Sequence, residues 1–419
     1  MKPALVYKIT VLFGLVIVTT PIPAGYATEF NSGEYTLNQV VQLALQHNPM
    51  MSGAEAVLEQ SQGQRVTAGA YLNPTITGSA GRGSIRDPST GVSITERTIT
   101  VEQPFEWLGK RAARQRAADG GLAGALAGME ETQVIVKADV KGAFFHLLFA
   151  QQDAQLAREN LKTVENLVKL VSARVSTREA PKFELVKATV ELQKSKKDLA
   201  RADNALLVAR AKLNTVAGMA LGESFAIQGE FETVRIGLEL RVLIDQARDR
   251  QPALHRQQRL VEQAEFTIEQ ERASRMPNVA VIGQYHREAG DESVTGGLSV
   301  PLPIWYRRQG EIGTAMGTHR RAQADRDRLQ QELAQTITQH FQEMQTAHAQ
   351  MQVFEQGLLH QAKEVFDIAQ FSFRHGATSL LEVLDAQCVN RQTLLEYAQA
   401  RADHSIALAR LERAVGGLP

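Results

Sequence analysis

Hydrophobic and polar positions follow two different periods along this chain. Residues 35–70 show a helical pattern that Pro49 interrupts. Residues 74–85 and 95–105 alternate apolar and polar side chains, as two strands of a β-hairpin whose turn is the sequence RDPSTG. Residues 110–175 contain no proline and return to a helical pattern, which predicts a helix of about 100 Å. The first half of the chain is therefore predicted to run from helix to hairpin to very long helix.

The far end of the long helical segment has the pattern of a coiled coil. Glycines near its start are expected to bend or divide it, and a turn with the sequence STREAP is expected to reverse the chain. The returning helix keeps a heptad order from Leu185 to Val216. The apolar seam of the outgoing helix consists of Leu161, Val164, Val168, Val171 and Val175. Leu185, Val186, Leu381 and Leu384 are expected to pack inside the coiled coil.

The same order of segments occurs a second time, about 200 residues later. Pro252 corresponds to Pro49, and Pro277 corresponds to Pro74. A second hairpin is predicted over 279–302, with EAGDES at its turn, followed by helices over 308–374 and 379–415. The turn between these helices, RHGAT, contains a glycine that can supply a positive φ, whereas the first turn has none. The chain is therefore an internal duplication.

The duplication predicts four parts. Residues 1–27 are expected to form a cleaved signal peptide, because a basic start precedes an apolar run and small residues up to Ala27. An anchor that stays attached is the alternative. The first repeat is expected over 28–218, a connecting equatorial segment over 219–240, and the second repeat over 241–419. The connecting segment has mixed character and is expected to pack outside the helices.

Composition excludes several classes of protein. The 46 basic and 46 acidic residues balance, so net charge gives no argument for nucleic-acid binding. The single cysteine, Cys388, cannot form an intramolecular disulfide, and no cysteine follows the apolar run to carry a lipid. No phosphate-binding glycine loop and no hydrolase or metalloprotease motif occurs, so neither an enzyme nor a cofactor is expected.

Four predicted strands are too few to close a membrane β-barrel within one chain. Strands of about ten residues suit a tilted crossing of a bilayer, but open sheet edges cannot be satisfied in lipid. Single-chain barrels begin at about eight strands, so several chains would have to share one barrel. The heptad helices also need partners. These arguments predict a symmetric oligomer with a strand barrel at one end and a helical tube at the other.

Several sequences resemble the outer-membrane efflux protein (TolC-like) family. They are YTLNQVVQLALQHNP, the two proline-led strands, GGLSVPLPIWYRRQGEI and FRHGATSLLEVLDAQ. The resemblance covers nearly all of the mature chain and includes the duplication. Within the family, EQPFEWLGKRAARQRAA and PLPIWYRRQGEI are most similar to the heavy-metal cation (cobalt–zinc–cadmium type) branch. Many relatives in that branch carry an N-terminal lipidated cysteine, which this chain lacks.

The resemblance implies a mainly α fold with a small β part. It implies a homotrimer whose chains give four strands each to one 12-stranded outer-membrane β-barrel, continuous with a long periplasmic α-helical barrel. Such a protein is the passive exit duct of a tripartite efflux system. Its partners would be a periplasmic adaptor (a membrane fusion protein), an inner-membrane pump of the resistance-nodulation-division type and outer-membrane lipid. Heavy-metal cations are the favoured substrate, and a multidrug or type I protein-secretion duct is the alternative. A soluble periplasmic coiled-coil scaffold is a competing hypothesis that the alternating strands disfavour.

The resemblance also points to a periplasmic entrance. Glu382 and Asp385 lie three residues apart on one helical face, where the family carries acidic residues. A threefold ring of carboxylates there would attract cations. The matching positions of the first repeat are Glu184 and Lys187, so opposite charges are expected to meet between neighbouring hairpins at a closed entrance. The alternative is that these acids only complement a helix dipole.

The two helical turns are candidate contacts for the adaptor, and the alternative for both is an ordinary surface turn. Their residues are Arg178, Glu179 and Ala180 in the first turn and His375, Gly376, Ala377 and Thr378 in the second. No metal site is predicted. His340 and Met344 could share a helical face but are expected to serve packing or to face solvent, and Met50 and Met51 are expected to fill gaps in the core.

Overall fold

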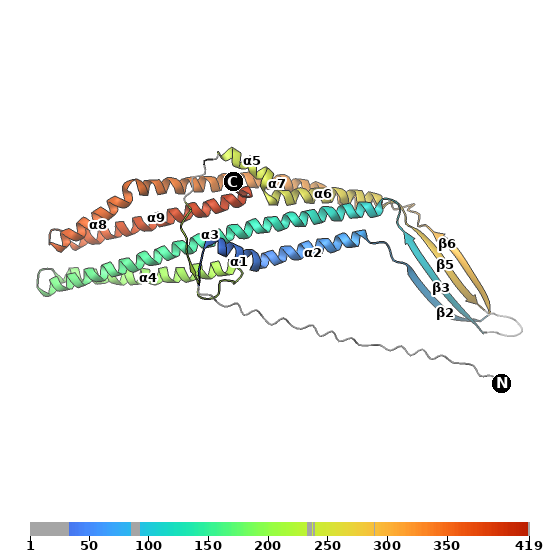
Figure 1. The fold of residues 1–419 in the computed structure, drawn as a ribbon, viewed down its shortest axis with the longest axis horizontal. Coiled ribbons are helices and arrows are strands. Elements are labelled where there is room, and N and C mark those ends of the chain that lie inside the picture. The colour runs from blue at the N-terminus through green and yellow to red at the C-terminus, as the bar shows by residue number, and fades with distance from the viewer. Residues whose placement is uncertain (1–32, 85–92, 233–236, 238, 289, 418–419) are drawn as a thin grey trace, which may run out of the picture.

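The structure is a computed structural model that describes residues 33–84, 93–232, 237, 239–288 and 290–417. The predicted signal peptide and the RDPSTG turn lie outside these residues. The molecule is elongated, with a small sheet at one end and two helical hairpins at the other (Figure 1). None of the helices in the described part of the chain has the length and apolar character needed to cross a bilayer.

The elements repeat in the predicted order. The first repeat contains β1 (Glu34–Tyr35), α1 (Leu37–His47), α2 (Pro49–Gly69), β2 (Thr75–Ser84), β3 (Ser93–Phe105), α3 (Lys110–Ser176) and α4 (Lys182–Val216). After β4 (Ala226–Ile227), the second repeat contains α5 (Leu240–Arg250), α6 (Pro252–Ala273), β5 (Val279–Glu288), β6 (Asp291–Ser299), α7 (Gln309–Val353), α8 (Leu359–Arg374) and α9 (Leu380–Val415). The duplication seen in the sequence is therefore a duplication of structure.

The two repeats share the same cap where their short first helix meets the second. Asn48 precedes Pro49, accepts a hydrogen bond from the Met50 amide (2.8 Å) and donates one to the Val216 carbonyl (2.7 Å). Gln251 precedes Pro252 and donates to the Arg413 carbonyl at 2.8 Å. Proline suits the first helical position because its missing N–H would have no partner there. Each cap thus fastens the start of a repeat to the end of its last helix.

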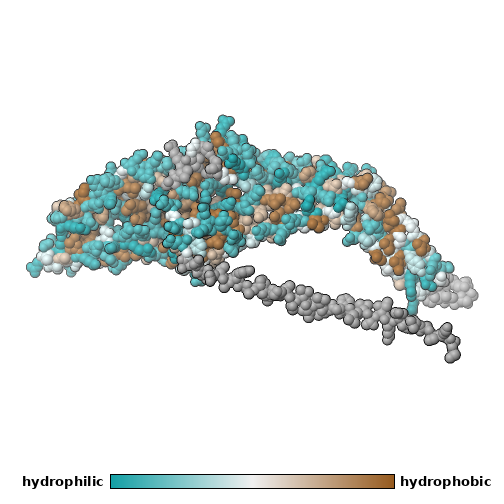
Figure 2. Space-filling model, viewed as in Figure 1, coloured by the Kyte–Doolittle hydropathy of each residue, from teal (hydrophilic) through white to brown (hydrophobic). Residues whose placement is uncertain are grey.

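The four long strands form one antiparallel sheet in the order β2-β3-β5-β6, so β2 and β6 are its edges. The register places apolar side chains together on one face, in pairs such as Ile76 with Val101 and Ile99 with Tyr285. The opposite face is polar, and Thr98 Oγ1 lies 2.9 Å from His286 Nδ1 on it. Figure 2 shows the hydrophobic residues along the strand end. The sheet has one face suited to lipid and one suited to water.

Helix α3 is a single helix of 67 residues. The helix is not divided at the glycines near its start, which pack against α6. Gly120 lies so close to α6 that an added Cβ would meet the Gln263 Cα at 3.1 Å. Small residues allow two helix backbones to approach in this way. The α3 glycines therefore fix the distance between the first and the second repeat.

The matching helix of the second repeat is broken, although residues 308–374 were predicted as one helix. A π-helical turn, Phe354–Leu358, separates α7 from α8 and contains Gly357 with φ 147°. Two further expectations need correction. Strand β6 ends at Ser299, so Val300 and Leu302 lie outside it, since Pro301 and Pro303 cannot donate to a sheet. EAGDES is not all turn, because the strands continue to Glu288 and resume at Asp291.

The connecting segment lies against the main core and not outside the helices. Phe225, Ile227 and Phe231 are buried in the same cluster as Phe144 and Phe145 of α3. The backbone of β4 pairs in parallel with β1, so this segment also closes the start of the first repeat. Large apolar side chains explain the burial, because leaving these two phenylalanines and one isoleucine in water would cost several kcal/mol.

Candidate functional site

The candidate site is the end of the molecule farthest from the sheet, where the α3/α4 and α8/α9 hairpins turn (Figure 1). The predicted seam of α3 is confirmed at Val164 and Val171, which are fully buried. Val171 packs in one cluster with Ala188 of α4, Phe373 of α8 and Val383 of α9. The two hairpins therefore support each other down to their tips.

The prediction that Val186 and Leu381 pack inside the coiled coil is wrong. Leu185 and Leu384 pack partly into the tip cluster, but Val186 and Leu381 are exposed. Consecutive residues on a helix point about 100° apart, so Val186 and Leu381 leave the seam because their neighbours Leu185 and Leu380 enter it. Val186 and Leu381 thus give the outer surface of the hairpins apolar character.

The two turns reach similar shapes by different means. In the second turn Gly376 adopts φ 74°, and the Ala377 amide donates to the Ser372 carbonyl at 2.8 Å. In the first turn Arg178 takes the left-handed position with φ 65°, although it is not a glycine. The Glu179 amide then donates to the Arg174 carbonyl at 2.8 Å. In both turns these amides donate hydrogen bonds to carbonyls at the end of the preceding helix that would otherwise lack a partner, as in a left-handed C-cap.

Most of the predicted turn residues are accessible. Arg178 and Glu179 are exposed in the first turn, where Ala180 is half-buried. In the second turn His375, Gly376 and Ala377 are exposed and Thr378 is half-buried. The His375 ring lies 4.2 Å from the ring of Phe371, and its Nδ1 is 2.9 Å from the Phe371 carbonyl, which fixes the imidazole against the end of α8.

An apolar groove between α8 and α9 brings several predicted residues together. It has a volume of about 660 Å³ and is lined by Ala377, Thr378, Glu382 and Asp385, with Leu358, Val365, Ile368 and Val389 among its apolar residues. The carboxylates of Glu382 and Asp385 are exposed at this groove. The predicted turn and the predicted entrance acids therefore form one continuous surface.

Glu382 and Asp385 differ in their relation to the helix end. Ser379 caps α9, and its side chain accepts a hydrogen bond from the Glu382 amide. Glu382 lies in the first turn, where a negative charge is stabilised by the helix dipole, and Glu184 has the same place in α4. Asp385 lies one turn later and gains little from the dipole. Stabilisation by the helix dipole can therefore explain the acids at Glu382 and Glu184, but it does not explain Asp385.

Lys187 and Asp385, whose opposite charges were predicted to meet at a closed entrance, form no ion pair with each other within this chain. Lys187 and Asp385 lie on different helices, and no ion pair within 4.0 Å joins them among the described residues. Both side chains remain available to a neighbouring molecule.

A polar network inside the hairpins was missed by sequence reasoning. Gln387 is buried and donates to Asn160 Oδ1 at 2.7 Å, and Asn160 donates to Ser195 Oγ at 3.1 Å. Close by, Arg391 donates to Asp198 at 2.9 Å. Burial opposes ionisation of Asp198, but the hydrogen bond and charge of Arg391 outweigh it, so the pKa of this carboxyl lies below its usual value. The one available signal was Ser195, a polar residue at a seam position.

The histidine and methionine residues considered above as metal ligands make other contacts or are exposed in the structure. His340 Nδ1 lies 2.9 Å from the Glu343 carboxylate, and Met344 is buried in the core of the second repeat. Met51 is buried as a gap filler, whereas Met50 is exposed. Across the described residues, no group of three or more His, Cys, Asp or Glu side chains is arranged to hold a metal ion.

Comparison with known proteins agrees with this geometry. The chain matches the family described as "Outer membrane efflux protein" over residues 40–219 and 243–417. It is 24% identical over 387 residues to the cobalt-zinc-cadmium resistance protein CzcC of Cupriavidus metallidurans, covering 92% of this chain and 91% of that protein. It is 23% identical to the pyoverdine export outer membrane protein OpmQ of Pseudomonas aeruginosa, covering 92% and 84%.

The fold is also that of known structures. The crystal structure of CusC superimposes with a TM-score of 0.78 at 16% identity, covering 96% of this chain and 98% of that chain. The chain therefore belongs to the outer membrane efflux protein family, and it is a TolC-like outer-membrane efflux channel whose helices extend into the periplasm.

Proposed function

We propose that three copies of this chain form one duct. The supporting observation is the four-stranded sheet with free edges at β2 and β6, whose backbone groups need partners in lipid. Three such sheets joined edge to edge supply twelve strands, above the roughly eight at which barrels close. The apolar face of each sheet would meet lipid and the polar face would line the bore.

The periplasmic end of the duct docks on an adaptor. The two turns lie at the end of the molecule opposite the sheet, and the Arg178–Ala180 and His375–Thr378 segments present backbone and side chains there. Arg174 stiffens this surface, since it donates to the Phe373 carbonyl at 2.7 Å and stacks over the Phe373 ring at 4.6 Å. The adaptor then connects the duct to an inner-membrane pump of the resistance-nodulation-division type.

The groove between α8 and α9, with Glu382 and Asp385 at its edge, forms the entrance of the duct. In a threefold assembly Glu382 and Asp385 recur around the axis, and a ring of carboxylates raises the local concentration of cations. Lys187 and Glu184 of a neighbouring hairpin face this ring when the entrance is closed. The duct itself is passive, because the pump supplies the energy.

Heavy-metal cations are the substrate. The single observation that carries this assignment is the similarity to the cobalt-zinc-cadmium resistance protein CzcC over 92% of the chain. The acidic entrance is consistent with a cationic substrate. Export of pyoverdine or a similar compound is the second candidate, favoured by the similarity to the pyoverdine export protein OpmQ over an equal share of the chain.

Gene deletion tests the substrate directly. A strain that lacks this protein is expected to become more sensitive to divalent cobalt, zinc and cadmium than to dyes or detergents. The measurement is the inhibitory concentration of each compound, with the intact gene restored on a plasmid as the control. Equal or greater sensitivity to dyes and detergents would refute the metal assignment and favour the multidrug alternative.

A further inference from the structure

The connections from strand to helix carry large apolar side chains that nothing in the chain covers. Among the exposed large hydrophobic side chains of the described residues, Leu108 at 93% and Trp305 at 89% are the most exposed. Leu108 follows β3 and Trp305 follows β6, so they occupy equivalent places in the two repeats. Their exposed neighbours are Phe105, Trp107, Leu302, Ile304 and Tyr306. This set is called the junction belt below.

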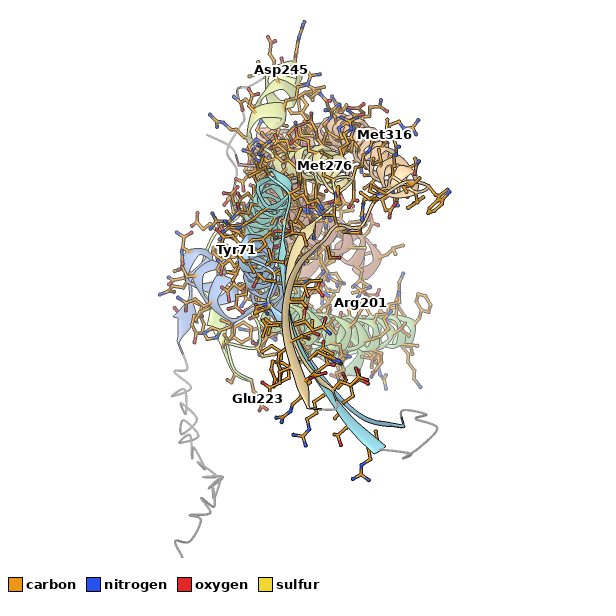
Figure 3. The ribbon with its side chains drawn as sticks, turned by 90° about the vertical axis from the view of Figure 1, so that its right-hand side faces the viewer. Tyr71, Arg201, Glu223, Asp245, Met276 and Met316 are labelled. Carbon is orange, nitrogen blue, oxygen red and sulfur yellow. The ribbon has the colours of Figure 1, made fainter. Side chains whose placement is uncertain are left out.

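The junction belt continues the apolar face of the sheet. Phe105, the last residue of β3, pairs with Val279 of β5, on the same face as Ile99 and Val101. Figure 3 looks at the strand end of the molecule and labels Tyr71 and Met276 in the two connections that run from helix into strand. Both of these side chains are also exposed. Each of the four connections between strands and helices at this end therefore carries an exposed large hydrophobic side chain.

Each half of the junction belt leads directly into two basic residues. Lys110 and Arg111 follow Leu108, and Arg307 and Arg308 follow Tyr306. Arg111 lies over the Tyr71 ring at 4.2 Å, and Arg308 donates to the Glu271 carboxylate at 3.0 Å. An exposed aromatic surface next to paired basic residues has the amphipathic character of a membrane interface.

Arg307 is placed differently from the other basic residues. Its side chain donates only to the Pro303 carbonyl, at 3.3 Å, and among the described residues no carboxylate lies within ion-pair distance of it. The guanidinium group is therefore held at the junction belt with donors left over. A planar group with several N–H donors matches the oxygens of a phosphate.

We propose that the junction belt binds anionic phospholipid of the periplasmic leaflet. Trp107, Leu108 and Trp305 insert beside the upper acyl chains, and Arg307 binds the headgroup phosphate. The belt thus sets the depth at which the channel sits in the membrane. The inference uses the outer-membrane location of the channel and is independent of its substrate, its adaptor and its pump.

The two tryptophans of the chain, Trp107 and Trp305, are both in the junction belt and make a built-in probe. The Trp107→Phe variant leaves Trp305 alone, and the full-length protein is placed in phosphatidylcholine bilayers that contain brominated phosphatidylglycerol or brominated phosphatidylcholine. We expect the brominated phosphatidylglycerol to quench Trp305 more strongly at equal mole fraction. Arg307→Gln in this background is expected to lower the relative association constant for phosphatidylglycerol about fivefold.

Controls separate this site from general charge effects. Lys196→Gln removes an exposed basic residue of α4, far from the sheet, and should leave the lipid preference unchanged. The reverse variant, Trp305→Phe, reports the depth of Trp107, and circular dichroism confirms that each variant folds. Quenching of Trp305 by aqueous iodide and not by brominated lipid would overturn the proposal. So would equal quenching of Trp305 by the two brominated lipids.

Discussion

His404 lies in the interior of α9, with 1% of its surface exposed. Its Nδ1 donates to the Glu232 carbonyl at 2.9 Å, so it fastens the connecting segment to the last helix. Burial lowers the pKa of His404, the hydrogen bond to Glu232 works against this, and the ring of His348, 5.7 Å away, lowers it further. The imidazole is therefore kept neutral in the folded protein.

This histidine makes folding depend on pH. The pKa in the folded state lies below the unfolded value of about 6.5, so the unfolded state takes up the proton first and stability falls as the pH drops below that value. His404→Asn keeps a donor for Glu232 and should make the fall in melting temperature between pH 8 and pH 5 shallower. The exposed His360→Gln variant should keep the original slope. Equal slopes for all three proteins would contradict the role of His404.

Single positions also mark where sequence reasoning stops. The glycine-containing second turn could be predicted, because glycine adopts a positive φ at little cost. The first turn could not, since Arg178 takes the same conformation at a cost of about 1 kcal/mol that the surrounding hydrogen bonds must offset. Likewise nothing in the sequence pairs Gln387 with Asn160, because they lie on helices from different repeats.

At the scale of elements, periodicity predicted the long helices and the four long strands, but not the short strands β1 and β4 or the break between α7 and α8. No proline marks the break, and Gly357 alone is a weak signal, since glycines within α3 leave that helix intact. The difference lies in packing. Glycines of α3 lie against α6, whereas Phe354 beside the break packs against Tyr397 of α9. Such contacts are decided by tertiary structure, which a pattern within one segment does not contain.

The packing role of the α3 glycines can be tested by a matched pair of substitutions. An added methyl at Gly120 meets the α6 backbone at 3.1 Å, whereas one at Gly124 meets the flexible Leu260 side chain at 3.7 Å. Gly120→Ala should therefore destabilise the fold by about 1–3 kcal/mol through overpacking. Gly124→Ala should be neutral or stabilise by up to about 1 kcal/mol, because alanine favours helix. Thermal unfolding followed by circular dichroism distinguishes them, and equal melting temperatures would argue against the tight contact.

At the scale of the whole molecule, the duplication predicted the architecture because each repeat carries the same strands, caps and hairpins. The sequence could not say that the connecting segment enters the core, since that depends on where α3 places Phe144 and Phe145. It also could not show that the predicted entrance acids share one groove with the second turn. The structure joins Glu382 and Asp385 to the second turn through one groove and leaves Lys187 on a separate helix.

The two acids at the groove between α8 and α9 lead to a prediction for the assembled duct. If Glu382 and Asp385 recur around a threefold axis, their mutual repulsion and their hold on cations both restrict flow through the entrance. The double variant Glu382→Ala with Asp385→Ala should therefore raise single-channel conductance in planar bilayers and weaken blockade by divalent cations. Asp367→Ala is the matched control, because it removes an exposed acid of the same hairpin outside the groove. Unchanged conductance and blockade in the double variant would place the entrance elsewhere, since removing charge from the narrowest part of a duct must alter its current.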